Sequence, residues 1–374
     1  MRCEHCNRCG KCGAFAAVPI REEGEAKLPL PMLRAGMGAA VDIGTTTIVA
    51  RVYDLSTGRR VHQAAVMNPQ RDIAADVMGR ISAAMAGRLD ELNNRVRAAI
   101  WSAVGEYKIT EAVMVGNTTM MHLLAGVDPS SFATAPFVAK RLFGETIRLD
   151  GVSVRLPRCA HAFFGADAVA SLMMSEICND NAVAMLVDVG TNGEIALWDG
   201  KDLRVSSVAA GPAFERAGIA GSELVAKIAD ALLAGAIDDT GLSKGVLPSG
   251  ITQDDVRAVQ LAKSAICAGI MTLTEKSKVD LGSVKKLVVA GGLGSALDLD
   301  KAEAIGLLPA GIKRVTSVRG NLAIEGASAY LLNPKFADKA DELSARAVHC
   351  EFGGDDVFYH HFVDAMRYDI ISSV

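Results

Sequence analysis

The chain has 374 residues and a net charge of −4, and 50% of its residues are hydrophobic whereas only 5% are aromatic. This length exceeds what one core usually organises, so we expect two lobes and a short appendage. Charges of both signs are interspersed, which excludes the basic footprint of a protein that binds nucleic acid or anionic membrane. No apolar run approaches the roughly 18 to 20 residues that span a bilayer, so we expect a cytoplasmic protein.

The first twelve residues carry regularly spaced cysteines, with two residues in each gap: Cys3, Cys6, Cys9 and Cys12. Four thiolates can hold an iron–sulfur cluster or a tetrahedral zinc ion. The common cluster spacing places three residues before the fourth cysteine, so the closing gap of two is a departure. We predict an iron–sulfur cluster, with [4Fe–4S] favoured, and keep zinc or unligated thiols as alternatives. Residues 13–38 are expected to form a linker, because they combine Pro and Gly with mixed charges.

A strand–turn–strand pattern occurs once in each half of the chain. Asp42 ends an apolar strand, and Asp188 occupies the same place in the second half. A Gly/Thr turn presents backbone N–H groups and hydroxyls to an anion, and the carboxylate can hold a metal ion or orient a water. An isolated turn of this kind is ordinary, but its duplication predicts a polyphosphate clamp. The predicted phosphate contacts are Gly44, Thr45, Thr46, Gly190, Thr191 and Asn192.

Each half continues with an apolar strand that ends in a Gly-containing turn, and then closes with a small-residue helix near residues 165–172 or 325–331. The first such turn contains Asn117. The second is predicted to bind the adenosine side of a nucleotide, because glycines let a ligand approach the backbone closely. Its candidate residues are Gly291, Gly292 and Gly294. Asn117 and Asn321 could equally be turn caps. We therefore predict two duplicated α/β lobes, residues 39–181 and 182–334, with a nucleotide cleft between them.

Apolar spacing predicts further helices at 73–85 and 89–104 in the first lobe, and at 222–233 and 254–274 in the second. Residues 335–374 are expected to form a polar helix followed by an extended tail. Glu215 follows a strand near the predicted cleft, where it is either a catalytic carboxylate or a solvated loop acid. The histidines lack a ligand cluster at metal spacing and are expected to be core or surface residues: His122, His161, His360 and His361.

The paired turns, together with Ala290-Gly291-Gly292, resemble the actin, Hsp70 and sugar-kinase superfamily of ATPases. Four strings are similar to the ATPase part of reductive activators of corrinoid proteins: 115–123 (VGNTTMMHL), 186–194 (LVDVGTNGE), 210–215 (AGPAFE) and 305–309 (IGLLP). The resemblance covers about residues 39 to 334. It implies two duplicated ribonuclease-H-like lobes that follow an N-terminal Cys-rich segment.

The resemblance also implies a function, which is ATP-dependent delivery of one electron to a corrinoid protein, so that cobalt returns from Co(II) to Co(I) for methyl transfer. The implied cofactors are ATP and Mg²⁺. Asp42 would bind the metal ion. Asp188 would orient the attacking water or a water in the outer shell of the metal, and Glu215 would be the third catalytic residue. The implied partners are a corrinoid protein of a methyltransferase system and a low-potential electron donor. A homodimer is left open.

Two features depart from the family pattern. Family members are often built with an N-terminal plant-type [2Fe–2S] domain, whereas here 38 residues with the compact four-cysteine segment precede the first lobe. The residue after Glu215 is usually Gly, whereas here it is Arg216. The alternatives to a reductive activator are a small-molecule kinase of the same fold and an ATP-regulated binding module.

Overall fold

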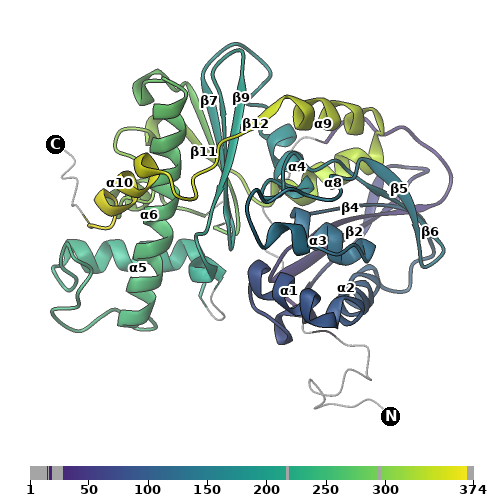
Figure 1. Ribbon diagram of the computed structural model, residues 1–374, viewed down its shortest axis with the longest axis horizontal. Helices are drawn as coiled ribbons and strands as arrows, with labels where there is room; N and C mark the ends of the chain where they lie inside the picture. Colours follow the sequence, from purple (N-terminus) through teal and green to yellow (C-terminus); the bar gives the residue numbers. More distant parts are fainter. Residues whose placement is uncertain (1–14, 16, 19–27, 216–218, 294–295, 369–374) are drawn as a thin grey trace. The chain divides into compact units, whose positions relative to one another are not determined.

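The computed structural model describes residues 15, 17–18, 28–215, 219–293 and 296–368 (Figure 1). The four cysteines of the N-terminal segment, Arg216 and Gly294 lie outside these residues. The chain forms two compact units. The first comprises the chain up to Met174 together with Ala323–Ala345, and the second comprises Ser175–Leu322 together with the chain from Arg346 onward.

The first unit is built on a six-stranded mixed sheet in the order β3-β2-β1-β4-β6-β5. Its strands are β1 (Met37–Ile43), β2 (Thr47–Asp54), β3 (Arg59–Met67), β4 (Ile109–Gly116), β5 (Glu145–Leu149) and β6 (Val152–Leu156). The first three form an antiparallel meander, whereas β4 runs parallel to β1, and β6 parallel to β4. Six consecutive residues of β1 are buried, as expected for a central strand that is covered on both faces.

The helices of the first unit are the 3-10 helix η1 (Pro69–Asp72), α1 (Val77–Ala83), the π segment η2 (Ala84–Arg88), α2 (Leu89–Val104), α3 (Thr118–Ala125), η3 (Ser130–Phe132), α4 (Ala166–Ser175), α8 (Leu322–Leu332) and α9 (Lys335–Arg346). Helix α2 has the predicted bounds. Helix α1 begins later than predicted because Asp76 caps it, accepting a hydrogen bond from the Gly79 N–H at 2.8 Å.

Helices α8 and α9 pack with the first unit, although the sequence predicts that the second lobe runs to residue 334. Arg51 on β2 forms an ion pair of 2.8 Å with Glu325 on α8, and both side chains are 9% exposed. A Cβ at Gly326 would lie 2.6 Å from the Ala170 Cβ, so α8 and α4 are in direct contact, side by side in Figure 1. The small residues of α8 thus allow an approach that no local pattern predicts.

The second unit has a six-stranded sheet in the order β11-β10-β7-β8-β9-β12. Its strands are β7 (Ala184–Val189), β8 (Gly193–Trp198), β9 (Leu203–Val208), β10 (Lys286–Gly291), β11 (Thr316–Val318) and β12 (Ala347–His349). Strands β7, β8 and β9 again form an antiparallel meander. Strand β10 runs parallel to β7, and β11 runs parallel to β10. The order β9-β8-β7-β10-β11 repeats the order β3-β2-β1-β4-β6 of the first sheet, whereas the sixth strands, β12 and β5, lie at different edges. The five shared strands confirm the predicted duplication of ribonuclease-H-like α/β lobes.

The helices of the second unit are η4 (Pro212–Glu215), α5 (Gly221–Leu233), α6 (Gln253–Lys276), η5 (Leu281–Ser283), α7 (Leu299–Ala304), η6 (Lys313–Val315) and α10 (Asp356–Asp364). Helix α6 begins with a capping box between Thr252 and Asp255, as its sequence indicates. By length and composition alone α6 could cross a membrane, but 72% of its apolar window is buried. Val256, Ile266 and Ile270 belong to the core of the unit, so α6 is a core helix.

Both ends of the described chain are more ordered than the sequence predicts. The expected extended tail is wrong, because residues 356–364 form α10, capped by Asp355 and packed through Phe358 and Phe362 against the second core. Buried Lys263 of α6 donates to the carbonyl oxygens of Ala365 and Arg367. In the linker, Val18 N–H donates to the Ala65 oxygen of β3 at 2.9 Å.

Candidate nucleotide site

The connection from β1 to β2 consists of Gly44, Thr45 and Thr46. The Gly44 N–H donates to the Thr47 oxygen at 3.0 Å, and a Cβ at Gly44 would lie 2.6 Å from that oxygen, so the turn requires glycine. Asp42 lies on β1 two residues before the turn and is 8% exposed. The structure therefore places the predicted carboxylate next to the predicted phosphate contacts, as expected for residues that are close in sequence.

Asn117 joins this turn from the neighbouring strand. Its Oδ1 accepts from the Met120 N–H at 2.9 Å, so Asn117 caps α3. Its Nδ2 also donates to the Thr45 Oγ1 at 3.1 Å. A Cβ at Gly165 would lie only 2.4 Å from the Asn117 Cα, so the start of α4 closely approaches the end of β4. Asn117 is thus both a helix cap and a neighbour of the turn.

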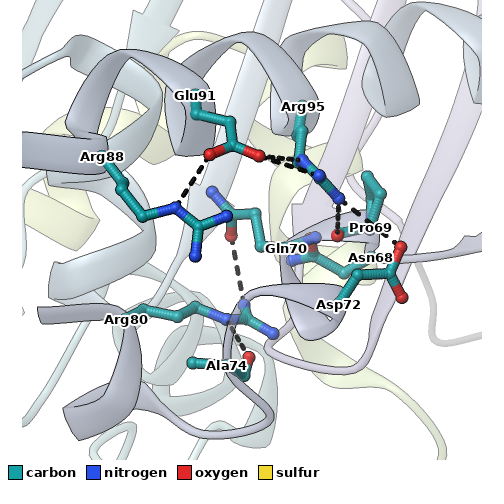
Figure 2. Close-up of polar contacts among 9 residues, drawn as sticks. All are labelled: Asn68, Pro69, Gln70, Asp72, Ala74, Arg80, Arg88, Glu91 and Arg95. Carbon is teal, nitrogen blue, oxygen red and sulfur yellow. Dashed lines mark hydrogen bonds and ion pairs between the residues drawn. The ribbon is translucent and has the colours of Figure 1, made fainter. Parts of the chain in front are cut away.

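A set of buried polar residues that the sequence did not identify holds the back of the turn. The Gly44 oxygen accepts from Asn68 Nδ2 at 2.9 Å, the Thr45 oxygen from the Arg80 guanidinium at 2.6 Å, and the Thr46 oxygen from the Asn68 N–H at 2.8 Å. Figure 2 shows the surroundings of Arg80, which also donates to Gln70 Oε1 and to the Ala74 oxygen, each at 3.1 Å. Burial lowers the pKa of Arg80 to about 10, so it remains protonated at neutral pH.

The second turn is built from residues 190–192 between β7 and β8. The Gly190 N–H donates to the Asn192 oxygen at 2.8 Å. Asp188 lies on β7 beside Ala290 of the parallel strand β10. Gly291 has φ of +93°, and a Cβ there would lie 2.4 Å from Asp188 Oδ1. The Gly292 N–H donates to the Val189 oxygen at 2.7 Å. The structure thus brings Asp188, the Gly190–Asn192 turn and both glycines together at the carboxyl ends of β7 and β10.

The roles of the remaining candidates stay predictions. Glu215 is the last residue of η4, which follows β9 in the second unit. Gly294 and the four cysteines lie outside the described residues, so their predicted roles stay predictions. Among the residues that the structure describes, no group of three or more His, Cys, Asp or Glu side chains could hold a metal ion.

The histidines that the structure describes fit the prediction of core or surface positions. His122 is fully buried, with Nδ1 2.7 Å from the Thr118 oxygen, and its ring meets Phe132 and Phe143 edge-on. Burial lowers the pKa of His122. His361 lies near the surface, with Nε2 2.8 Å from a Glu275 carboxylate oxygen.

Two sheets that share the order of five strands, each with an Asp-containing strand that leads into a Gly/Thr turn, define the class of the actin, Hsp70 and sugar-kinase fold. A family model described as the RACo middle region matches residues 37–180. A second, described as the C-terminal domain of RACo, the ASKHA domain, matches residues 182–220 and 248–372. The chain belongs to the family of reductive activators of corrinoid proteins, as the sequence resemblance predicts.

Individual relatives are similar over most of the chain. The corrinoid activation enzyme RamQ of Eubacterium limosum is 29% identical, over 87% of this chain and 69% of RamQ. A Methanosarcina barkeri reductase of the Co(II) methylated amine-specific corrinoid protein is 21% identical, over 88% of this chain and 77% of the reductase. The solved structure of a reductive activator for a corrinoid, iron–sulfur protein has a TM-score of 0.85 at 26% identity, over 91% of this chain and 68% of that structure.

Proposed function

We propose that this protein uses ATP to drive one electron from a low-potential donor onto the cobalt of a corrinoid protein. The donor loses one electron, and Co(II) of the partner becomes Co(I), the state that accepts a methyl group. The observation that carries the proposal is the similarity to a solved reductive activator, which extends over 91% of the chain and therefore includes both units. The small-molecule kinase alternative is supported only by the general fold, which many functions share.

The two turns are proposed to contact the phosphates of ATP. Their residues fit such a ligand, because Thr45 and Thr46 offer N–H groups and the Asp42 carboxylate is an oxygen ligand of the type that Mg²⁺ prefers. Mg²⁺-ATP, when bound, supplies the free energy of phosphate hydrolysis. In this proposal Asp42 holds the metal and Asp188 orients the attacking water. Glu215 is proposed as a further catalytic carboxylate.

The four-cysteine segment is proposed to carry the electron on an iron–sulfur cluster, with zinc as the alternative. Ala17, five residues after Cys12 in the sequence, pairs with Val66 of β3. A cytoplasmic location is part of this proposal, because thiolates persist in a reducing compartment.

The test is an anaerobic assay that follows the Co(II) to Co(I) absorbance change of a candidate corrinoid protein in the presence of a low-potential chemical reductant. We expect reduction only when ATP is present, and we expect Asp188→Ala to abolish both reduction and ATP hydrolysis. The matched control is Asp202→Ala, because Asp202 is a half-exposed carboxylate of the same unit that pairs with Arg204.

A parallel assay for phosphorylated small molecules separates the two readings. Transfer of phosphate to an acceptor, without ATP-dependent cobalt reduction for any partner tried, would favour the kinase. Full ATP hydrolysis by Asp188→Ala would remove Asp188 from the proposed site.

A further inference from the structure

We infer that Arg80, together with Asn68, is a positioning residue that presets the Gly44–Thr46 turn to receive an anion. The inference rests on the proposed function, since it takes this turn as a phosphate-binding element. It adds a buried cation and an amide that lie outside the turn sequence.

Hydrogen bonds to the carbonyl oxygens fix the direction of the peptide groups in the turn. Three consecutive carbonyl oxygens, those of Gly44, Thr45 and Thr46, accept hydrogen bonds from Asn68 or Arg80. In a trans peptide the C=O and the following N–H point in opposite directions. Holding the Gly44 and Thr45 carbonyls from behind therefore turns the N–H groups of Thr45 and Thr46 to the other side of the turn.

These N–H groups are available to a ligand. Within the described part of the chain, neither the Thr45 N–H nor the Thr46 N–H donates to another protein group. Successive N–H groups that point into one concavity bind anions, because their partial positive charges add. The turn is thus arranged for an anion before one arrives, which lowers the ordering cost of binding.

Arg80 also brings a buried positive charge to the turn. Arg80 has no exposed surface, and its hydrogen-bond acceptors are neutral: the Thr45 and Ala74 oxygens, Gln70 Oε1 and the Met120 sulfur. The acidic group that raises the pKa of Arg80 is Asp76, the cap of its own helix, which partly offsets the larger lowering by burial. An uncompensated buried charge is costly. Here it lies directly behind the turn, where its field favours an anion on the opposite side.

Two neighbouring arginines show the contrast (Figure 2). Arg88 and Arg95 come from the following segment, and each forms an ion pair with Glu91, at 2.9 and 2.8 Å. Their side chains are 45% and 35% exposed. The surface arginines are therefore neutralised by a carboxylate, whereas the buried one is directed at the turn. Arg88 provides a matched control for the test.

The test compares affinities for Mg²⁺-ATP and for adenosine, which lacks phosphates, in the full-length protein. In Arg80→Met the carbonyl of Thr45 is released, and we expect ATP to bind about tenfold or more weakly, the effect of losing one charge-assisted hydrogen bond. Adenosine affinity should change by less than about twofold, since the turn contacts only phosphates. Arg80→Lys should restore part of the ATP affinity, because it keeps the charge. Arg88→Met should match the wild type for both ligands.

The outcomes separate the inference from the proposed function. Equal weakening of ATP and adenosine in Arg80→Met would show a purely structural role and would overturn the inference. Failure of the wild type to bind Mg²⁺-ATP would instead overturn the proposed function. If Arg80→Met does not fold, Arg80→Lys and Asn68→Ala provide the same ratio of affinities, and an unchanged ratio in both would refute the inference.

Discussion

Replacing Gly291 with alanine should impair ATP hydrolysis through Asp188. Gly291 has φ of +93°, and an added Cβ would lie 2.4 Å from Asp188 Oδ1 and 2.4 Å from the Val189 oxygen. The backbone conformation costs alanine about 1–2 kcal/mol. Relieving the two contacts adds about 1–3 kcal/mol, as in other overpacked sites. The free energy of unfolding should therefore fall by roughly 2–5 kcal/mol.

The same contacts require the Asp188 carboxylate to move. A displacement of about 1 Å at a reacting group can lower a rate by about 10²-fold. The matched control is Gly235→Ala, because Gly235 also has positive φ, +71°, but no atom lies within 4 Å of its added Cβ. This control should lose about 1–2 kcal/mol of stability and keep its turnover number. Urea denaturation and steady-state ATPase assays on both variants measure the difference. Equal ATPase activity in the two variants would refute the assignment of Asp188.

Three further predictions concern the rest of the molecule. Arg51→Met should lower the free energy of unfolding, measured by urea denaturation, by about 3–5 kcal/mol, because Glu325 would remain buried without its partner. A loss below about 1 kcal/mol would contradict this expectation. The additional change Glu325→Gln should recover much of the lost stability. The wild type should lose stability as the pH falls below the ordinary histidine value of 6.5, because burial lowers the pKa of His122 and the unfolded chain binds the proton more tightly. His122→Phe should reduce the dependence of the free energy of unfolding on pH between about pH 7 and 5. An unchanged pH dependence in this variant would contradict the role of His122. The last change replaces the four cysteines of the N-terminal segment with serine: Cys3, Cys6, Cys9 and Cys12. The variant should contain no iron or sulfide and should not reduce cobalt, but it should still bind ATP. Stoichiometric zinc in the anaerobically prepared wild type would instead assign the segment a structural role.

The sequence predicted the elements whose causes are local. Helix α2 has the predicted bounds because its apolar residues recur at helical spacing and place Leu92, Val96 and Ile100 in the core. The two turns are recognisable because Asp, Gly and Thr fall within four consecutive residues and the pattern occurs twice. For the same reason Asp42 lies beside Gly44 in the structure whatever the surrounding fold.

The sequence did not predict contacts between distant segments. Arg80 and Thr45 are 35 residues apart, and an arginine in an amphipathic helix is normally assigned to the surface. The role of Asn68 has no local signal either, because the Gly44 oxygen that accepts from its side chain belongs to a turn 24 residues earlier. Helix α10 was missed because Phe358 and Phe362 gain their stability from a core that the tail sequence does not contain.

The discontinuous first unit has a consequence for biosynthesis. Residues 323–345 belong to that unit but follow the whole of residues 175–322 in the chain. A ribosome therefore synthesises most of the second unit before it synthesises α8, which contains the residues that contact Arg51 and Ala170. Domains generally fold in the order in which they emerge, the N-terminal one first. Here the N-terminal unit has to wait with part of its sheet uncovered, so its nascent form is the species that chaperones would be expected to bind.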